Sequence, residues 1–312
     1  MKARKGKFLE FYEKYRGRGF VITSHRNADI DSLCCMYALH AFFPKAVLAL
    51  PGDVEEPAEG FAKELGMKWE KLSSLDPRDF EGLVVVDTSA PSLVPGGEAW
   101  RKLLIVDHHV KNGFMFEAEY EVRDEDAPSA AEIMAEILPE LSQKVAFALA
   151  CGIVSDSARF KGGRKLTFET FVKLMDISGK EYQEILKWGE PELTLKLKGE
   201  VLEALRNMKV QSAGSYLIAS VEVKDNESLI ASSISEFADV ALAAKWKESE
   251  GATKVSARGR KSVGVKLNEV LAQVAREYGG AGGGHPKAAG CAAKERPDIV
   301  LRRIIELVKE KL

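Results

Sequence analysis

The sequence predicts an α/β protein with two domains: an N-terminal domain built on a parallel sheet and a smaller α/β C-terminal domain, joined by a helical linker. Three observations lead to this fold class. The chain has 312 residues, twice the roughly 150 of an average domain. In its first half, short apolar runs alternate with segments of helical length, which is typical of a parallel sheet with helical crossovers. From residue 128 the pattern turns helical, and strand patterns return near residue 210.

Four runs in the first half have the length and β-branched composition of buried parallel strands. They cover residues 20–23, 46–50, 83–86 and 103–106, and helices are expected over 32–43 and 55–65. Residues 128–205 are expected to be mainly helical, with an interruption at Trp188–Pro191 because Gly and Pro break helices. We therefore predict an N-terminal domain over 1–187, a linker over 188–204 and a C-terminal domain over 205–312. In that last domain the patterns predict strands at 215–223, 254–257 and 262–265 and helices at 234–242 and 267–278.

Composition excludes several classes of protein. With 45 basic and 47 acidic residues, the net charge of −2 gives no argument from bulk charge for binding to nucleic acid or membranes. A hydrophobic content of 46% argues against disorder. The longest apolar run, 145–154, is half of the roughly 20 residues that a membrane span requires. The basic N-terminus lacks the apolar segment of a secretory signal, so we expect a cytoplasmic protein with no membrane partner.

Polar residues with metal-binding side chains follow three of the predicted strands. Ligands bind outside the carboxyl ends of the strands in an open α/β sheet, so these positions are candidate site residues. They are His25, Asp29 and Asp31 after the first strand, Asp87 after the third, and Asp107, His108 and His109 after the fourth. Asp156 follows an apolar helix in the segment GIVSDS.

Each of these residues also has a structural interpretation. Asp29 or Asp31 can cap the helix that begins near residue 32, and Asp87 can be a turn residue. Taken together, however, several carboxylates at one sheet edge would repel one another unless cations lay between them. Four carboxylates match the charge of two divalent ions. Mixed imidazole and carboxylate ligands fit Mn²⁺ best, with Mg²⁺, Co²⁺ or Zn²⁺ as substitutes, and two such ions can activate a water molecule for attack on phosphorus.

The Asp-His-His segment at 107–109, preceded by H-x-x-x-D-x-D and a strand-end Asp and followed by G-I-x-x-D-S, resembles the DHH phosphoesterase superfamily. That superfamily includes RecJ-like exonucleases, oligoribonucleases, cyclic dinucleotide phosphodiesterases and family II inorganic pyrophosphatases. The resemblance implies one ion held by His25, Asp29 and Asp87, and a second held by Asp31, Asp87, His108 and Asp156. It also implies that His109 faces the scissile phosphate and that Asp107 orients the neighbouring imidazoles.

A glycine-rich string over 279–290 is the second strong signal. Its backbone N–H groups are expected to form a turn that binds phosphate, with His285 as a further donor; the alternative is a mobile loop before a helix. The segment G-G-G-H-x-x-A-A-G resembles the DHH-associated C-terminal domain of RecJ-like and oligoribonuclease-type members, whereas the pyrophosphatases have a different one. Ser256-Ala257-Arg258 matches the S-x-R strand of that domain. The resemblance thus implies substrate contacts from Ser256, Arg258, Gly283, Gly284 and His285.

Two local charge runs accompany these motifs. Residues 245–266 and residues 2–18 each contain seven basic and two acidic residues, although solvated surface is the alternative explanation of such runs. The family resemblance implies a Mn²⁺-dependent phosphodiesterase that acts as an exonuclease on single-stranded DNA or RNA or on short oligonucleotides and releases mononucleotides. A helicase or another replication or repair protein would be its protein partner. The alternatives are a 3′-phosphoadenosine 5′-phosphate phosphatase, a cyclic-dinucleotide phosphodiesterase, and a non-catalytic replication or repair scaffold.

Overall fold

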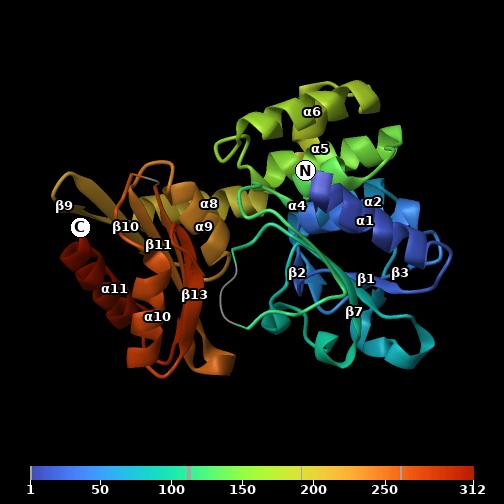
Figure 1. The fold of residues 1–312 in the computed structure, drawn as a ribbon. Helices are drawn as coiled ribbons and strands as arrows, with labels where there is room; N and C mark the ends of the chain where they lie inside the picture. The colour runs from blue at the N-terminus through green and yellow to red at the C-terminus, as the bar shows by residue number, and fades with distance from the viewer. Residues whose placement is uncertain (1, 111–113, 191, 261) are drawn as a thin grey trace. The chain divides into compact units, whose positions relative to one another are not determined.

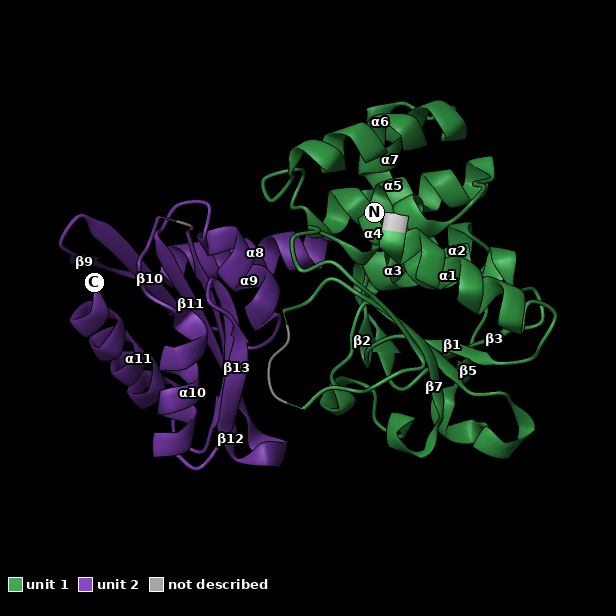
Figure 2. Ribbon diagram, in the orientation of Figure 1, with its two compact units in different colours: residues 1–192 green, residues 193–312 purple. Residues whose placement is uncertain are grey.

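A computed structural model of the chain describes residues 2–110, 114–190, 192–260 and 262–312 (Figure 1). The chain forms two compact units, residues 1–192 (unit 1) and 193–312 (unit 2), which Figure 2 draws in different colours. The division falls inside the span 188–204 for which the sequence predicts a linker. Helix α8 (Leu195–Asn207), at the end of that span, packs on β10 and α9 of unit 2.

Unit 1 contains a six-stranded sheet in which all neighbouring strands run parallel, in the order β5-β3-β1-β6-β7-β8. Its strands are β1 (Val21–Thr23), β3 (Val47–Leu50), β5 (Glu70–Lys71), β6 (Leu83–Val86), β7 (Lys102–Asp107) and β8 (Tyr120–Arg123). A separate parallel pair joins β2 (Asn27–Ala28) to β4 (Asp53–Val54). The parallel sheet predicted from the sequence is confirmed, although β2, β4, β5 and β8 were not predicted.

Both faces of this sheet are covered, and the strands therefore read as continuous apolar runs. Alternate residues such as Ile22 and Val84 join the larger core under the helices, while their neighbours Val21 and Val85 join a smaller core on the other face. The helices of unit 1 are α1 (Lys2–Tyr15), α2 (Ile30–Phe42), α3 (Glu56–Glu64), α4 (Ala130–Ile137), α5 (Gln143–Asp156), α6 (Lys165–Ser178) and α7 (Tyr182–Gly189). Short 3₁₀ turns lie at 72–74, 77–79, 91–93 and 97–99.

The strand order places a topological switch point between β1 and β6. From β1 the chain proceeds outward to β3 and β5 on one side, then returns to β6, β7 and β8 on the other. The connections that leave β1 and β6 therefore diverge, and a crevice opens outside their carboxyl ends where ligands bind in such folds. His25 follows β1 and Asp87 follows β6, so the sequence motifs flank this crevice.

Unit 2 is a mixed sheet in the order β13-β14-β12-β11-β10-β9, in which only the β10–β11 pair is parallel. Its strands are β9 (Lys209–Ala213), β10 (Tyr216–Glu222), β11 (Val240–Lys247), β12 (Ala252–Gly259), β13 (Ala281–His285) and β14 (Ala288–Ala293). Helices α10 (Leu267–Glu277) and α11 (Pro297–Lys311) cover one face, while α8 and α9 (Glu227–Ile234) pack on β10 and β11 on the other. The predicted fold class is confirmed.

Three local predictions for unit 2 are wrong. Residues 234–242 are not a helix: α9 ends at Ile234, and the apolar run that follows is β11, buried on both faces and therefore without polar alternation. Residues 262–265 are not a strand, because the carbonyls of Val263 and Val265 accept hydrogen bonds from the Lys287 ammonium instead of joining a ladder. The glycine string is neither a turn nor a mobile loop; it forms β13 and the hairpin to β14.

Among the described residues, no helix combines the length and the apolar character needed to cross a membrane.

Candidate metal centre

The candidate ligands of unit 1 converge at the carboxyl ends of β1, β6 and β7. Three groups of side chains have ligand atoms that all lie within 4.8 Å of one another. The groups are His25, Asp29 and Asp87; Asp31, Asp87, His108 and Asp156; and Asp87, His108 and His109. The structure therefore brings together all six residues predicted as metal ligands, with Asp87 common to every group.

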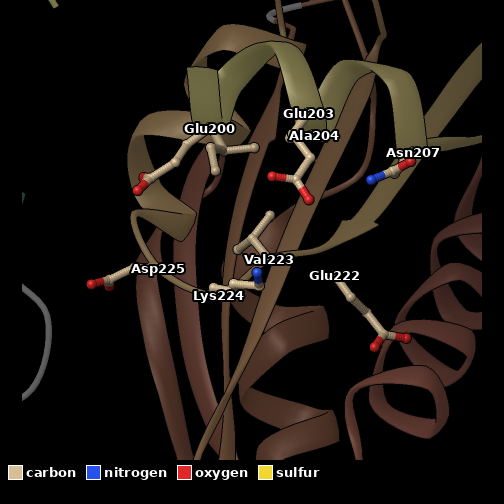
Figure 3. A pocket seen from close by; sticks show the side chains of 9 residues that line it. Glu200, Glu203, Ala204, Asn207, Glu222, Val223, Lys224 and Asp225 are labelled. Carbon is tan, nitrogen blue, oxygen red and sulfur yellow. The ribbon is translucent and has the colours of Figure 1, made fainter. Parts of the chain in front are cut away.

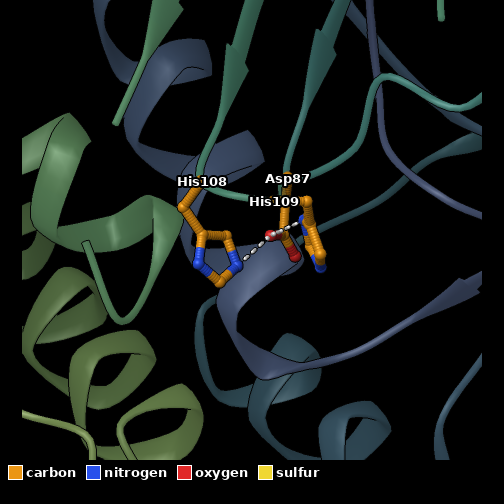
Figure 4. Close-up of side chains that lie close together, drawn as sticks. All are labelled: Asp87, His108 and His109. Carbon is orange, nitrogen blue, oxygen red and sulfur yellow. Dashed lines mark ion pairs between the residues drawn. The ribbon is translucent and has the colours of Figure 1, made fainter. Parts of the chain in front are cut away.

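Asp87 lies at the centre of the cluster and is almost fully buried. Its Oδ2 lies 3.6 Å from His25 Nε2. Its Oδ1 lies 3.3 Å from His108 Nε2 and 3.9 Å from His109 Nδ1, as Figure 4 shows for these three residues. The residue has a φ of 59°, a left-handed conformation that side chains other than glycine adopt rarely and mostly where function requires it. The backbone of Asp87 thus bends as the turn-residue interpretation expects, while its carboxylate lies among the candidate metal ligands.

Helix termini orient two of the acidic ligands. Asp29 is the N-cap of α2: its Oδ1 accepts from Ser32 N at 2.9 Å, while its Oδ2 lies 3.8 Å from His25 Nε2. Asp31 accepts hydrogen bonds from the backbone N–H groups of Ala130 and Ala131 at the start of α4, at 2.7 and 2.9 Å. A helix N-terminus favours negative charge, which holds this buried carboxylate in place. Asp29 can therefore cap α2 with one carboxylate oxygen and face the candidate metal site with the other.

The hydrogen bonds of His108 define its tautomer. Its Nδ1 lies 3.1 Å from the carbonyl oxygen of Ala127, which can only accept, so Nδ1 carries the proton in the neutral ring. Nε2 then presents a lone pair toward Asp87 and toward Asp156 Oδ2, which lies 3.4 Å away. Among the described residues, neither His108 Nε2 nor Asp87 Oδ1 has a hydrogen-bond partner, although both atoms are buried. Buried polar atoms are rarely left so, and a cation between them accounts for both.

His109 and Asp107 form a second layer beside the ligands. Asp107 Oδ1 accepts from the backbone N–H and from Nδ1 of His109, at 3.1 and 2.9 Å. Asp107 Oδ2 accepts from Ser89 Oγ at 2.5 Å and from Arg123 Nη1 at 2.9 Å. His109 Nδ1 is engaged by Asp107, so this nitrogen does not serve as a metal ligand. Sequence reasoning missed both supports of Asp107, because Ser89 lies beyond the strand end and Arg123 lies on the unpredicted β8.

The electrostatics of the cluster point to a missing positive charge. Burial alone would lower the pKa of the His25 and His108 imidazoles, but neighbouring carboxylates raise both values. Asp87 and Asp29 raise the pKa of His25 to about 9. Asp156 and Asp87 raise the pKa of His108 to about 12. Burial and the charges of Asp87 and Asp156 raise the pKa of Asp29 to about 7. Without cations the cluster thus holds protons tightly, the response expected of crowded carboxylates that a metal would otherwise neutralise.

In unit 2, Arg258 differs from its basic neighbours. The other described basic residues of the run 245–266 each pair with a carboxylate: Lys245 with Asp225, Lys247 and Lys254 with Glu250, Arg260 with Asp239, and Lys266 with Glu269. Among the described residues, Arg258 instead donates only to neutral oxygens, those of Ser228, Ser232 and Ala257, at 2.9 to 3.2 Å. Lys261 lies outside the described residues. The run is therefore mostly solvated and paired surface, with one uncompensated guanidinium.

The register of the sheet places most of the predicted substrate contacts on one face. Gly283 pairs with Gly290, which pairs with Ser256; His285 pairs with Ala288, which pairs with Arg258. Residues two apart on a strand share a face, so Ser256, Arg258, Gly283 and His285 form two adjacent rows. Gly284 lies between two of them and faces the other side. A Cβ there would come within 2.7 Å of Ala288 O, whereas a Cβ on Gly283 would meet nothing within 4 Å.

A cavity of about 300 Å³ lies elsewhere in unit 2, beside α8 (Figure 3). Glu200 and Glu203 extend into its wall from α8, and Glu222 and Asp225 line it from the end of β10 and the following loop. Four carboxylates against Lys224 make this lining acidic. Negative charge repels phosphate, so the cavity does not fit the chemistry of the two motifs.

The basic residues of α1 and of the turn that follows it do not form a binding surface for an anion, because several of them pair with carboxylates. Arg4 pairs with Asp124 and Glu136, Lys14 with Glu119, and Arg16 and Arg18 with Glu13 and Glu81. The helix packs on β8 and α4, so much of its charge is neutralised within unit 1. Its charge run corresponds to the alternative explanation, a paired and solvated face.

Comparison with known proteins agrees with this geometry. Residues 19–153 match the family described as "DHH family, N-terminal domain", and residues 213–312 match the "DHHA1 domain". An uncharacterised protein of Methanocaldococcus jannaschii is 30% identical over 96% of this chain and 95% of its own length.

Two solved structures share the fold. An exopolyphosphatase-related protein from Bacteroides fragilis has a TM-score of 0.77 at 15% identity, over 100% of this chain and 96% of that one. RecJ in complex with Mn²⁺ from Thermus thermophilus has a TM-score of 0.54 at 14% identity, over 99% of this chain and 55% of that one. The resemblance inferred from the sequence is confirmed: this chain belongs to the DHH superfamily of phosphoesterases, with a DHH domain followed by a DHHA1 domain.

Proposed function

We propose that this protein is a Mn²⁺-dependent phosphodiesterase that removes mononucleotides from single-stranded DNA or RNA or from short oligonucleotides. One observation carries the proposal. Asp87 is shared by every candidate ligand group, and its Oδ1 faces His108 Nε2 with both atoms buried and without hydrogen-bond partners among the described residues. A shared carboxylate between two ligand sets is the arrangement expected for two neighbouring divalent ions.

In this proposal His25, Asp29 and Asp87 hold one ion, and Asp31, Asp87, His108 and Asp156 hold the other. The four carboxylates balance the charge of two divalent cations, and the oxygen and imidazole donors suit Mn²⁺, with Mg²⁺ or Co²⁺ as substitutes. Bound together, such ions lower the pKa of a water molecule and stabilise negative charge on the oxygens of a phosphoryl centre.

The chain's own residues then orient the substrate. Burial lowers the pKa of His109, but the hydrogen bond to Asp107 and the charge of Asp87 outweigh it and raise that pKa, which favours the protonated ring. In that form the Nε2–H can donate to a phosphoryl oxygen. Ser89 and Arg123 keep Asp107 in position for that task. In unit 2, Arg258 and His285, with Ser256 and the open backbone at Gly283, bind a phosphate of the same substrate. A guanidinium without a carboxylate partner is suited to this role.

The test is digestion of end-labelled single strands of DNA and RNA, from the dinucleotide to about thirty residues, with Mn²⁺. We expect stepwise shortening from one end with release of mononucleotides, and loss of this activity in Asp87→Ala and His108→Ala, while Asp76→Ala at the surface remains active. Turnover of 3′-phosphoadenosine 5′-phosphate or a cyclic dinucleotide without shortening of any oligomer would replace the proposed substrate. Hydrolysis of nothing in the panel would favour a scaffold that binds a helicase or another replication or repair protein.

A further inference from the structure

A second cavity, of about 310 Å³, lies in unit 1 at the carboxyl ends of β3 and β5. It is lined by Leu50, Gly52, Asp53, Val54, Glu59, Trp69, Glu70 and Lys71. The strands of this parallel sheet end at one edge, so the cavity opens at the same edge as the metal-ligand cluster, one strand beyond β1. Its volume is at the lower end of the range for small-ligand pockets.

The lining suits a flat heteroaromatic ring. Trp69 is half-buried and offers part of its ring system, while Leu50 and Val54 add apolar surface. The described ion pairs include none of the lining carboxylates Asp53, Glu59 and Glu70, so these are available as hydrogen-bond acceptors. An aromatic face stacks on a nucleobase, and carboxylates accept from exocyclic amino groups such as those of adenine, guanine and cytosine. A phosphate, by contrast, would be repelled by this lining.

The arginine whose backbone lies against the lining residue Gly52 differs from the other arginines of unit 1. Eight of the nine arginines in residues 1–192 pair with carboxylates: Arg4, Arg16, Arg18, Arg78, Arg101, Arg123, Arg159 and Arg164. Arg26 is exposed, and within the described part of the chain it has no ion pair and no side-chain hydrogen bond. It directly follows the candidate ligand His25.

The backbone of Arg26 is fixed against the cavity wall. A Cβ on Gly52, a lining residue, would come within 2.3 Å of Arg26 O and 2.9 Å of Arg26 Cβ, so only glycine permits this close approach. The N–H of Arg26 donates to Leu93 O at 2.8 Å, and the next residue, Asn27, pairs with Asp53. The backbone and Cβ of Arg26 therefore lie against the cavity wall, one residue after the candidate ligand His25.

We infer that the Trp69 cavity and Arg26 form a subsite for a nucleotide next to the scissile phosphate: its base stacks on Trp69, and its phosphate binds Arg26. The inference rests on the proposed function and names part of its substrate, an oligonucleotide of at least two residues. A base that carries an exocyclic amino group is preferred over uracil or thymine.

Binding to the full chain tests the subsite without catalysis. A fluorescein-labelled adenine trinucleotide and a matched abasic trimer are titrated in EDTA and followed by anisotropy. Trp69→Leu should weaken binding of the adenine trimer about tenfold or more and leave the abasic trimer unchanged, while Trp69→Phe should restore stacking. Arg26→Gln should weaken both trimers by about tenfold, because both carry phosphates. Arg78→Gln changes an exposed arginine that pairs with Asp76; it is the matched control and should bind as the wild type does.

The outcomes separate this subsite from the proposed function. Equal affinity of wild type and Trp69→Leu for the adenine trimer, equal losses on both trimers in Trp69→Leu, or no binding of either trimer by the wild type overturns the subsite. Hydrolysis of bis(p-nitrophenyl) phosphate with Mn²⁺ tests the catalytic site alone, because this diester has one phosphate and no base. Its failure, with trimer binding intact, would overturn the proposed function and leave the subsite standing.

Discussion

The two units differ in the sign of the charge that their folds leave uncompensated. In unit 1, the ends of parallel strands bring together carboxylates that the surrounding protein does not neutralise, and the imidazoles among them gain protons in compensation. In unit 2, the described basic residues of the run 245–266 pair with carboxylates, except Arg258. What identifies a candidate site is therefore a charge that the fold leaves uncompensated: a negative cluster in unit 1, which calls for cations, and one guanidinium in the described part of the run 245–266, which calls for an anion.

If unit 1 requires cations, the metal-free protein should lose stability as the pH rises. The folded pKa of His25 is raised from 6.5 to about 9, so its contribution is full below pH 6.5 and is lost as the pH passes 9, a change of about 3 kcal/mol. The pKa of His108, raised from 6.5 to about 12, makes stability fall with pH across the same range. The pKa of Asp29, raised from 3.8 to about 7, acts in the same direction at lower pH, whereas the lowered pKa of Asp87 acts only in the acid range. Denaturation in EDTA at pH 6, 7.5 and 9 should show this fall, and Mn²⁺ should abolish it. A flat or rising profile in EDTA, or the same slope in His25→Gln, would contradict the interpretation.

If Arg258 is the uncompensated charge of the described run 245–266, its loss should matter far more than that of a paired neighbour. Arg258→Gln is expected to raise KM for a short oligonucleotide by about tenfold to a hundredfold, because a charge-assisted contact to phosphate is lost. Arg260→Gln, two residues away and paired with Asp239, is the matched control and should have little effect. Equal effects of the two variants in steady-state kinetics would mean that the whole basic run acts as a diffuse surface.

The layer behind the metal ligands should affect turnover more than metal binding. Ser89→Ala removes one of the two supports of Asp107 Oδ2, and we expect kcat to fall by about tenfold with KM and Mn²⁺ content nearly unchanged. Ser74→Ala, an exposed serine in a 3₁₀ turn, controls for a general effect. Loss of Mn²⁺ from Ser89→Ala would instead assign Asp107 to holding the ions.

Gly283 and Gly284 of β13 are expected to differ in role: Gly284 is needed for the fold, and Gly283 for substrate binding. Gly284 has a φ of 121° and no room for a Cβ, so Gly284→Ala should lower the free energy of unfolding by about 1 to 3 kcal/mol. A Cβ at Gly283 meets open space, so Gly283→Ala should keep its stability within about 0.5 kcal/mol and weaken substrate binding. Thermal denaturation and the KM of both variants check this prediction. Equal destabilisation of the two variants would mean that Gly283 does not lie on the face that binds the substrate.

The sequence predicted the elements in which pattern and burial coincide. Strands β1, β3, β6 and β7 were predicted because both of their faces are covered and their sequences are continuously apolar, and candidate ligands directly follow β1, β6 and β7. The run that forms β11 is equally apolar but was taken for a helix, since burial on both faces removes the alternation that distinguishes a strand. Arg123 could not be found because β8 is short and only partly apolar, and its partner Asp107 lies sixteen residues earlier. Pairing of the lysines with distant carboxylates was likewise invisible in a local charge count.

The number of Mn²⁺ ions that the cluster holds can be counted by isothermal titration together with metal analysis after gel filtration. We expect two ions per chain in the wild type, two in the surface variant Asp76→Asn, and loss of both in Asp87→Asn, because Asp87 belongs to both ligand sets. One ion or none in the wild type, or two ions retained by Asp87→Asn, would contradict this expectation.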